Sequence, residues 1–356
     1  MLRYLTAGES HGPQLTAILD GMPAGLPLSE EVINHDLARR QLSLGAGGRM
    51  KIETDRVQIT SGVMNSKTTG APIAFQITNA DHANWKGKEI PAYTIPRPGH
   101  ADLSATLKYG YEDIRPALER ASARESAVRV AVGATCRIFL AHFGIHINGQ
   151  VIQIGQEPDP AKFAHVIETA RTEGETLGGI IEVTVDHLPV GLGSYVQGDR
   201  RLDARLAQAM MSIPAIKGIE IGDAFANAAL PGTQVHDAIN TDLSRDTNNC
   251  GGIEGGMSNG EPIVLYLAMK PIPTTLKQQH SVDLVTGKGA DTKYERSDVC
   301  PVPRAVVVAE AAAAYVIADA LLEKLGGDSL VEMTPRFEQI KNSKPYVTGK
   351  PHIFWA

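Results

Sequence analysis

The chain has 356 residues, of which 43% are hydrophobic and 21% charged, a composition typical of a soluble globular protein that excludes a disordered or fibrous one. Its 34 Lys and Arg residues stand against 40 Asp and Glu residues, and the net charge of −6 argues against nucleic acid or a membrane surface as the main partner. An anionic ligand must therefore be held by a local cluster of cations.

The first predicted elements are a helix and a hairpin. Ser29 is followed by two glutamates, as an N-cap is followed by acidic residues in the first turn, and this predicts a helix over 29–42. Residues 50–62 alternate between apolar and polar, which predicts a hairpin that turns at Thr54 and Asp55.

The longest helix is predicted over 116–142. Pro116 suits the first turn of a helix and Gly144 is a stop signal. One face of this segment is mostly small, which favours close packing in the middle of the protein; it consists of Ala123, Ala127, Ala131, Ala134 and Ile138.

The rest of the chain mixes strands with helices. Strands are predicted at 145–154, 178–187 and 263–269, and helices at 161–172, 202–212 and 305–325. Because hairpins and helical pairs are mixed rather than strictly alternating, we predict an α+β fold of layered helices and antiparallel sheets.

The cysteines and the N-terminal segment indicate a reducing compartment. The three cysteines contain no CxxC pair, so they form neither a disulfide framework nor, on their own, a zinc site. The first nine residues hold no apolar signal region, and residues 305–325 carry too many charges for a membrane span. We expect a cytoplasmic protein without a membrane partner or a metal site.

Polar residues gather on five glycine-rich or turn-like segments. The phosphate loops GxGxxG and GxxxxGK[ST] are absent, which disfavours a Rossmann or P-loop enzyme. Each of the five segments offers a cation or an exposed amide to an anion; they are residues 8–12, 45–49, 97–102, 120–125 and 250–256.

Several side chains in or near these segments have two interpretations. His11 and His100 lie in loops, where an imidazole is either merely solvated or meets a ligand. Arg120, Arg124 and Arg129 either pair with neighbouring glutamates or face a polyanionic ligand, and Arg39 and Arg40 could add to the latter. Asp319, in an apolar stretch, either has a partner or faces a site. These alternatives stay open at this level.

The chain closely resembles the chorismate synthase family. The resemblance rests on Gly8-Glu-Ser-His-Gly-Pro-Gln-Leu15, Arg97-Pro-Gly-His-Ala-Asp102, the segment 119–134, Lys270-Pro-Ile-Pro-Thr274 and the segment 296–304. These motifs run in family order over nearly the whole chain. The resemblance implies a single domain over 1–356 with a β-α-β sandwich fold, assembled as a homotetramer.

The resemblance also implies an activity. Members are shikimate-pathway lyases that convert 5-enolpyruvylshikimate 3-phosphate into chorismate and phosphate by anti-1,4-elimination, the last step of that pathway in aromatic amino-acid biosynthesis. They need reduced FMN (FMNH2), although the reaction has no net redox change. NADPH is a candidate reductant, but the chain shows no long insertion that would form a reductase element, so we expect an external flavin reductase.

The resemblance assigns roles residue by residue. By similarity His11 protonates the departing phosphate, His100 lies by the flavin and Asp319 assists proton removal at the flavin. The flavin contacts carry over to Arg120, Ala121, Ser122, Ala215, Gly255, Lys270, Pro271, Ile272, Pro273, Thr274 and Arg304. The cations available for the substrate are Arg40, Arg49, Arg124 and Arg129.

Two positions depart from the family pattern. Ala121 replaces a serine that many members have, which removes one hydroxyl donor, and Ala46 stands where members often carry an arginine. Two other functions remain as alternatives. A flavin-dependent oxidoreductase would consume reduced flavin in net electron transfer, and a catalytically silent ligand-binding relative would not need the motif histidines.

Overall fold

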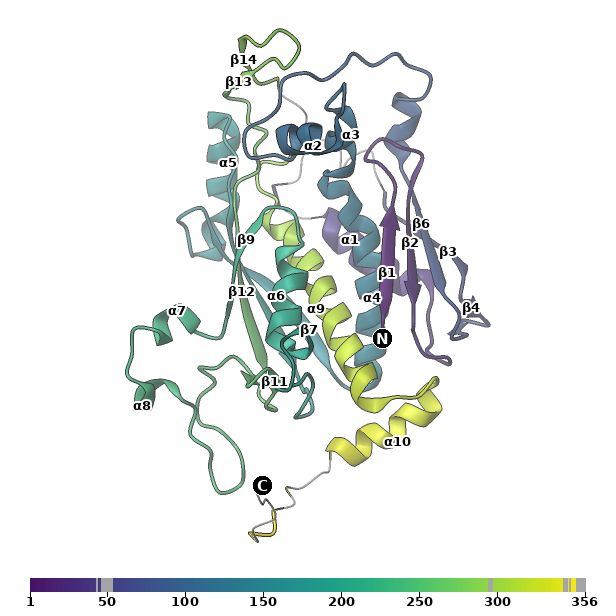
Figure 1. Ribbon diagram of the computed structural model, residues 1–356, viewed down its shortest axis with the longest axis vertical. Coiled ribbons are helices and arrows are strands. Elements are labelled where there is room, and N and C mark those ends of the chain that lie inside the picture. The colour runs from purple at the N-terminus through teal and green to yellow at the C-terminus, as the bar shows by residue number, and fades with distance from the viewer. Residues whose placement is uncertain (43, 46–53, 294–296, 342–344, 346, 350–356) are drawn as a thin grey trace, which may run out of the picture.

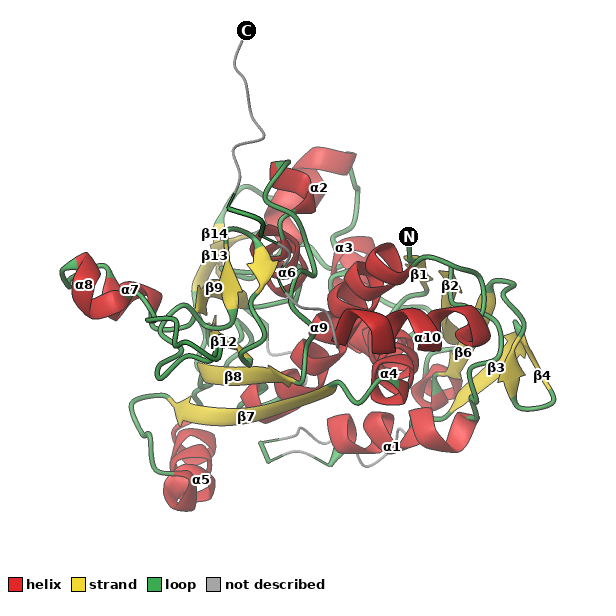
Figure 2. Cartoon of the chain, turned by 90° about the horizontal axis from the view of Figure 1, so that it is seen from below, coloured by secondary structure: helices red, strands yellow, loops and turns green. Residues whose placement is uncertain are grey.

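The computed structural model, which describes residues 1–42, 44–45, 54–293, 297–341, 345 and 347–349, places two antiparallel sheets on either side of a layer of helices (Figures 1 and 2). The first sheet has the order β1-β2-β6-β3, formed by Arg3–Ala7, Gln14–Asp20, Ile73–Thr78 and Val57–Ser61. The second has the order β7-β8-β12-β9, formed by His146–Ile154, Gly179–Asp186, Ile263–Met269 and Ile216–Ile221. The predicted α+β fold of layered helices and antiparallel sheets is therefore confirmed.

The helices fill the layer between the sheets and extend beyond it. They are α1 (Glu30–Gln41), α2 (Asp102–Tyr109), α3 (Arg115–Arg120), α4 (Ser126–His142), α5 (Phe163–Glu173), α6 (Leu202–Met211), α7 (Ala224–Asn227), α8 (Gly232–Val235), α9 (Val302–Leu325) and α10 (Leu330–Lys341). Short 3-10 turns are η2 (Ala80–Asn84), η3 (Ala123–Glu125), η4 (Pro160–Lys162) and η5 (Gly198–Arg200). Three two-stranded hairpins complete the described elements: β4–β5 (Val63–Met64, Lys67–Thr68), β10–β11 (Ile253–Glu254, Met257–Ser258) and β13–β14 (His280–Val282, Gly289–Asp291).

Alternation along the strands explains why each sheet buries one face. In β2 the residues Leu15, Ala17 and Leu19 are buried, and their neighbours in the chain are not, so one face of the first sheet packs on α4. The second sheet packs in the same way on α9. The main core therefore lies between the sheets, around α4 and α9 (Figure 1).

Helices α4 and α9 touch almost backbone to backbone. A Cβ added at Gly133 would lie 2.2 Å from the Cβ of Ala311, which no packing tolerates. The predicted small face, apart from exposed Ala123 and half-buried Ile138, is buried here as expected. Although α9 is apolar and long enough to cross a membrane, 83% of its most apolar window is buried within the protein, so it serves as a core helix.

One predicted helix needs correction, and one predicted hairpin is described only in part. The segment 116–142 is not one helix, because Ser122 adopts an extended backbone (φ −63°, ψ 140°) and its Oγ accepts a hydrogen bond from the backbone N–H of Arg124 at 3.3 Å. The longest helix in the described part of the chain is α9, with 24 residues. The predicted hairpin over 50–62 contributes β3, whose partner is β6, and its first arm lies outside the described residues.

Candidate active site

His11 is held by a half-buried carboxylate from a distant part of the chain. It lies in the turn between β1 and β2, and its backbone N–H donates to Glu119 Oε2 at 2.8 Å. Its ring Nδ1 lies 2.8 Å and 3.0 Å from the two oxygens of the same carboxylate on α3. Burial alone would raise the pKa of Glu119, but hydrogen bonding to His11 outweighs it and the pKa is lowered. His11 and Glu119 therefore form a fixed pair.

The other face of the His11 ring packs on residues that follow β6. Trp85 stacks on the imidazole with 3.9 Å between the ring centroids and 27° between the planes. Asp81 Oδ2 lies 4.0 Å from His11 Nε2, and His82 Nδ1 lies 2.9 Å from the His11 carbonyl oxygen. The ring is thus confined on several sides.

His100 forms a second pair with a carboxylate. Its Nδ1 makes a short contact with Asp102 Oδ1, and Arg97 grips the same carboxylate through Nε at 2.8 Å and Nη2 at 3.0 Å. Burial alone would raise the pKa of Asp102, but the hydrogen bonds from His100 and Arg97 outweigh it and hold that pKa well below its usual range. Both predicted histidines therefore have an ionised carboxylate partner.

A row of cation–π contacts connects the His11–Glu119 pair with the His100–Asp102 pair. The guanidinium carbon of Arg115 lies 5.8 Å from the ring centre of Trp85 and 5.3 Å from that of Tyr93. The guanidinium carbon of Arg97 lies 5.9 Å from the same Tyr93 ring centre. His11 and His100, 89 positions apart in the sequence, thus belong to one local assembly.

Three arginines and two aspartates form what we call the arginine cluster: Arg40, Arg124, Arg304, Asp55 and Asp298. Asp55 lies 3.2 Å from Arg40 Nη1 and 2.5 Å from Arg124 Nη1. Asp298 lies 2.7 Å from Arg304 Nη1. Burial lowers the pKa of Arg40 to about 10; Asp55 counteracts this, whereas Arg304 and Arg124 lower the pKa further. Cations outnumber anions in this cluster, which favours an anionic ligand.

Polar contacts join the cluster to both histidine pairs. Asn79 Nδ2 donates to the carbonyls of Glu9 and Gly12 on either side of His11, and its Oδ1 accepts from Arg124 Nε at 2.9 Å. On the other side, Thr274 Oγ1 accepts from Arg97 Nη1 at 3.2 Å.

The Thr274 carbonyl also accepts from Ser297 Oγ at 3.0 Å, next to Asp298. A series of side-chain contacts thus links the two pairs and the cluster in one region of the protein.

Arg304 shows that this region suits an anion. Its Nε and Nη2 are buried and have no hydrogen-bond partner in the described ranges of the chain, although Nη1 is paired with Asp298. Burying guanidinium donors without acceptors destabilises the folded protein by roughly several kcal/mol, and a bound acceptor removes this penalty. A phosphate or carboxylate group supplies such acceptors.

Several residues assigned to the cofactor by resemblance lie beside this region. Lys270 Nζ donates to the carbonyl of Gly99 at 2.5 Å, which places the segment 270–274 against the His100 loop. Ala215, at φ 69°, accepts the backbone N–H of Lys270 at 2.9 Å. Arg120, Ala121 and Ser122 lie at the break between α3 and α4, where Arg120 reaches back to Thr6 on β1.

Other assigned residues lie elsewhere within one copy of the chain. Asp319 is ion-paired with Arg205 and accepts the backbone N–H of Leu2 at 2.5 Å. It lies fifteen residues beyond Arg304 on α9, about 22 Å along the helix. Of the two alternatives left open for Asp319, the structure shows a partner, and the carboxylate beside Arg304 is Asp298.

Gly255 and Arg129 are also set apart. Gly255 lies in the β10–β11 turn near the start of β12, whereas Lys270 follows its end, about 20 Å away along the strand. Arg129 pairs with Glu125 at 2.9 Å, the helix ion pair that the spacing allowed, and also contacts Ser212. Arg49 and Ala46 lie outside the described residues.

A separate hollow is lined by residues of α1, β7 and α9. It has a volume of about 570 Å³ between α1, β7 and the start of α9, and its walls include Arg39, Leu42, Pro303 and Val306. Arg39 is occupied there, since its guanidinium grips Glu310 at 2.7 Å and 2.8 Å. This hollow therefore offers little to an anion.

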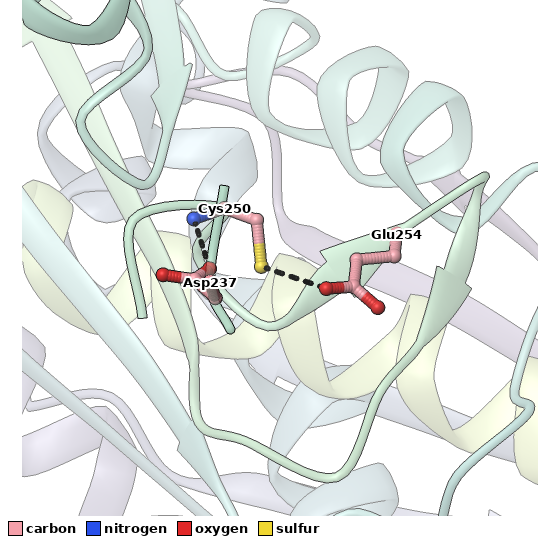
Figure 3. Close-up of side chains that lie close together, drawn as sticks. All are labelled: Asp237, Cys250 and Glu254. Atoms are coloured by element: carbon pink, nitrogen blue, oxygen red, sulfur yellow. Dashed lines mark hydrogen bonds between the residues drawn. The ribbon is translucent and has the colours of Figure 1, made fainter. Parts of the chain in front are cut away.

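Asp237, Cys250 and Glu254 form a separate group of metal-type ligands (Figure 3). Asp237 already accepts hydrogen bonds from Thr247 and from the backbone N–H groups of Asn249 and Cys250. Burial and the Asp237 carboxylate raise the pKa of Cys250 to about 11, so it remains a thiol, and Glu254 is paired with Arg245. The group ties down the loop that carries α7 and α8 and gives no ground for a metal site.

Sequence reasoning missed the partners that orient the histidines and arginines. The sequence suggests Glu119 only as a partner for arginine and Asp55 only as a turn residue, and no pattern in it singles out Asn79. Asp102 stood in a quoted motif without a role. A buried acid two residues after a loop histidine, as in His100-Ala-Asp102, is the one local signal that could have found such a partner.

Comparisons with known proteins agree on one family. A model of the family described as chorismate synthase matches residues 2–322. A protein named chorismate synthase from Caldanaerobacter subterraneus is 52% identical over 341 residues, covering 95% of this chain and 97% of the relative. One from Aquifex aeolicus is 50% identical over 388 residues, covering 96% and 98%. A solved structure titled "Crystal Structure of Chorismate Synthase" matches with a TM-score of 0.78 and 45% identity, covering 96% of this chain and 97% of that one.

Proposed function

The chain belongs to the chorismate synthase family, and on that premise we propose that it uses reduced FMN at the region in which contacts link the two histidine pairs and the arginine cluster. It is a carbon–oxygen lyase of the shikimate pathway. It converts 5-enolpyruvylshikimate 3-phosphate into chorismate and phosphate by anti-1,4-elimination.

The main support for the proposed site is that two buried N–H donors of Arg304, on Nε and Nη2, have no hydrogen-bond partner among the described residues. The substrate brings two carboxylates and a phosphate, and FMN brings another phosphate, so the site must present several cations at once. Arg40, Arg124 and Arg304 lie together there, and two buried donors of Arg304 lack a partner among the described residues. The residues present thus fit both anionic molecules.

The residues proposed to hold FMN are those beside the His100 loop and at the α3–α4 break. They are Arg120, Ala121, Ser122, Ala215, Lys270, Pro271, Ile272, Pro273, Thr274 and Arg304, with Gly255 as a further contact. When bound, reduced FMN supplies electron density transiently as the C–O bond to phosphate breaks. The protein's own part is to bind, to orient and to move protons.

His11 is proposed to give a proton to the departing phosphate. Its neighbours on the substrate side are cations that bind the phosphate: Arg124, linked through Asn79, and Arg40 beyond it. His100, fixed by Asp102, is proposed to hold a proton beside the cofactor. The proton-removal role given by resemblance to Asp319 fits Asp298 better within one copy, because Asp298 is the carboxylate at Arg304.

We also propose that the protein is a cytoplasmic homotetramer. The position of Gly255 supports assembly, since within one copy it lies near the start of β12, about 20 Å along that strand from Lys270. In a tetramer such a residue can serve the site of a neighbouring subunit. Light scattering should then give about four times 38.1 kDa, and a monomer at all concentrations would contradict the assembly.

The cofactor proposal is tested by an anaerobic assay with purified protein and substrate. With chemically reduced FMN at a small fraction of the substrate concentration, we expect many molecules of chorismate per flavin and no net flavin oxidation. Oxidised FMN with NADPH but without a reductase should give none, because we propose an external flavin reductase. Chorismate formed only in proportion to flavin oxidised would mean net electron transfer and would refute the proposal.

A further inference from the structure

We infer that Glu119 is a positioning residue for His11: its carboxylate fixes Nδ1 as the ring nitrogen that keeps a proton and leaves Nε2 as the nitrogen that exchanges one. The inference rests on the proposed role of His11 in proton transfer. It goes beyond that role because it names the group that sets the histidine's tautomer.

The contact between the two residues determines which nitrogen is protonated. Nδ1 lies 2.8 Å and 3.0 Å from the two oxygens of Glu119, both within hydrogen-bond distance. An ionised carboxylate can only accept hydrogen bonds, so the nitrogen that faces it must be the donor. The lowered pKa of Glu119, which results from the bond to His11 in spite of burial, agrees with an ionised group.

The same carboxylate also fixes the backbone of His11. Glu119 Oε2 accepts the backbone N–H of His11 at 2.8 Å, so a single side chain holds both the main chain and the ring. The ring plane is set by Trp85, stacked at 3.9 Å. With main chain, plane and Nδ1 all fixed, the position of Nε2 is fixed as well.

In the described part of the chain, the other charged groups near His11 lie farther from its ring nitrogens than Glu119 does. Asp81 on η2 faces Nε2 at 4.0 Å, which exceeds a hydrogen bond, and one of its oxygens accepts from Asn84 at 2.8 Å. His82 contacts the carbonyl of His11 and not its ring. Arg115 on α3 lies over Trp85, and Arg124 reaches this turn through Asn79. Glu119 alone among these grips a ring nitrogen.

This arrangement determines which ring nitrogen of His11 gives up a proton in the reaction. Because Nδ1 keeps its proton against Glu119, the form that donates is the imidazolium: its Nε2–H bond breaks, the proton passes to the departing phosphate, and the neutral ring keeps the proton on Nδ1. Without Glu119, a fraction of the protein molecules would carry the His11 proton on Nε2 with Nδ1 unprotonated, which is not the form that the reaction needs after proton transfer. Loss of the Glu119 charge should therefore affect turnover more than substrate binding.

The test uses ¹⁵N NMR of the full-length protein with labelled histidine, without flavin or substrate, and with His11→Asn to assign the signal. We expect His11 Nδ1 to carry a proton in the wild type. In Glu119→Gln, whose amide can donate as well as accept, we expect a measurable fraction protonated at Nε2 only. Glu125→Gln is the matched control, since it removes a buried carboxylate six residues away that does not touch His11, and should leave the His11 signal unchanged.

Kinetics provide the second measurement. Glu119→Gln should lower kcat by roughly 10²-fold or more with KM within about threefold, and Glu119→Asp, which keeps the charge, should recover part of the loss. A wild-type ring protonated only at Nε2, or a Glu119→Gln protein with unchanged tautomer or unchanged kcat, would overturn the inference. If the wild type forms no chorismate, the proposed function fails, while the NMR spectrum still decides the tautomer.

Discussion

Replacing Arg124 by alanine should weaken both the folded protein and its hold on anionic ligands. The side chain is buried, pairs with Asp55 at 2.5 Å and donates to Asn79 at 2.9 Å. Breaking a buried ion pair costs about 3–5 kcal/mol, but Asp55 keeps Arg40, so we expect about 2–3 kcal/mol. Unfolding entropy of about 2.1 cal/mol/K per residue over 356 residues then gives a Tm lower by about 3–4 °C.

The loss of ligand affinity is the part that identifies a functional arginine. Charge-assisted hydrogen bonds to a desolvated phosphate or carboxylate are worth about 2 kcal/mol or more, so the affinity for substrate or FMN should fall by about 30-fold. Arg124→Lys should recover only part of this loss, because an ammonium keeps the charge without the planar two-donor geometry. Flavin fluorescence titrations and substrate KM, beside thermal melting, measure both effects.

Arg137→Ala is the matched control for this experiment. Arg137 also lies on the long segment after η3 and pairs with buried carboxylates, at 2.7 Å from Asp36 and 3.3 Å from Glu310. Its loss should lower the Tm without changing ligand affinity, because it lies outside the arginine cluster. If Arg124→Ala behaves like this control, with a lower Tm and unchanged affinity, the assignment of Arg124 to the site is wrong.

Three further predictions follow from the geometry. His11→Ala and His100→Ala should each lower turnover by roughly 10²- to 10⁴-fold while flavin affinity and the melting temperature stay close to wild type; normal turnover in both variants would remove them from the mechanism. Gly133→Ala should destabilise the protein by about 3 kcal/mol or more, because the new methyl group would lie 2.2 Å from the Cβ of Ala311; a Tm equal to that of the wild type would show that the α4–α9 packing is looser than described. Burial alone would raise the pKa of Asp102, but hydrogen bonds from His100 and Arg97 lower it, so its ionised form contributes stability above its unfolded pKa of about 3.9 that is lost as the pH falls further. The Tm difference between wild type and Asp102→Asn should therefore shrink below about pH 4, and a difference that grows on acidification would contradict the sign.

The sequence allowed the layers to be predicted because their signals are local. Alternation along 178–187 and 263–269 and the apolar run 305–325 gave β8, β12 and α9 within a few residues. The break at Ser122 escaped prediction because helix propensity on both sides is high, and only a serine oxygen capping Arg124 turns the chain. After that break, Arg124 pairs with Asp55.

The sequence pointed to the arginines and histidines of the candidate site but not to the carboxylates that pair with them. His11, His100, Arg124 and Arg304 could be named from motifs, because they stand in the segments on which the resemblance rests. Their partners are remote: Glu119 lies 108 positions from His11, and Asp55 lies 69 from Arg124. No periodicity or spacing within one segment reports such pairs, since the topology of two sheets around α4 and α9 creates them.

The central claim is that the phosphate leaves from the region between the His11 pair and the arginine cluster. A crystal structure of the protein with oxidised FMN and 5-enolpyruvylshikimate 3-phosphate tests it most directly. We expect the substrate phosphate within about 3.2 Å of guanidinium nitrogens of Arg40, Arg124 or Arg304, with the His11 ring on the same side. An ordered substrate bound elsewhere, for example in the hollow beside Arg39 and Pro303, would contradict it.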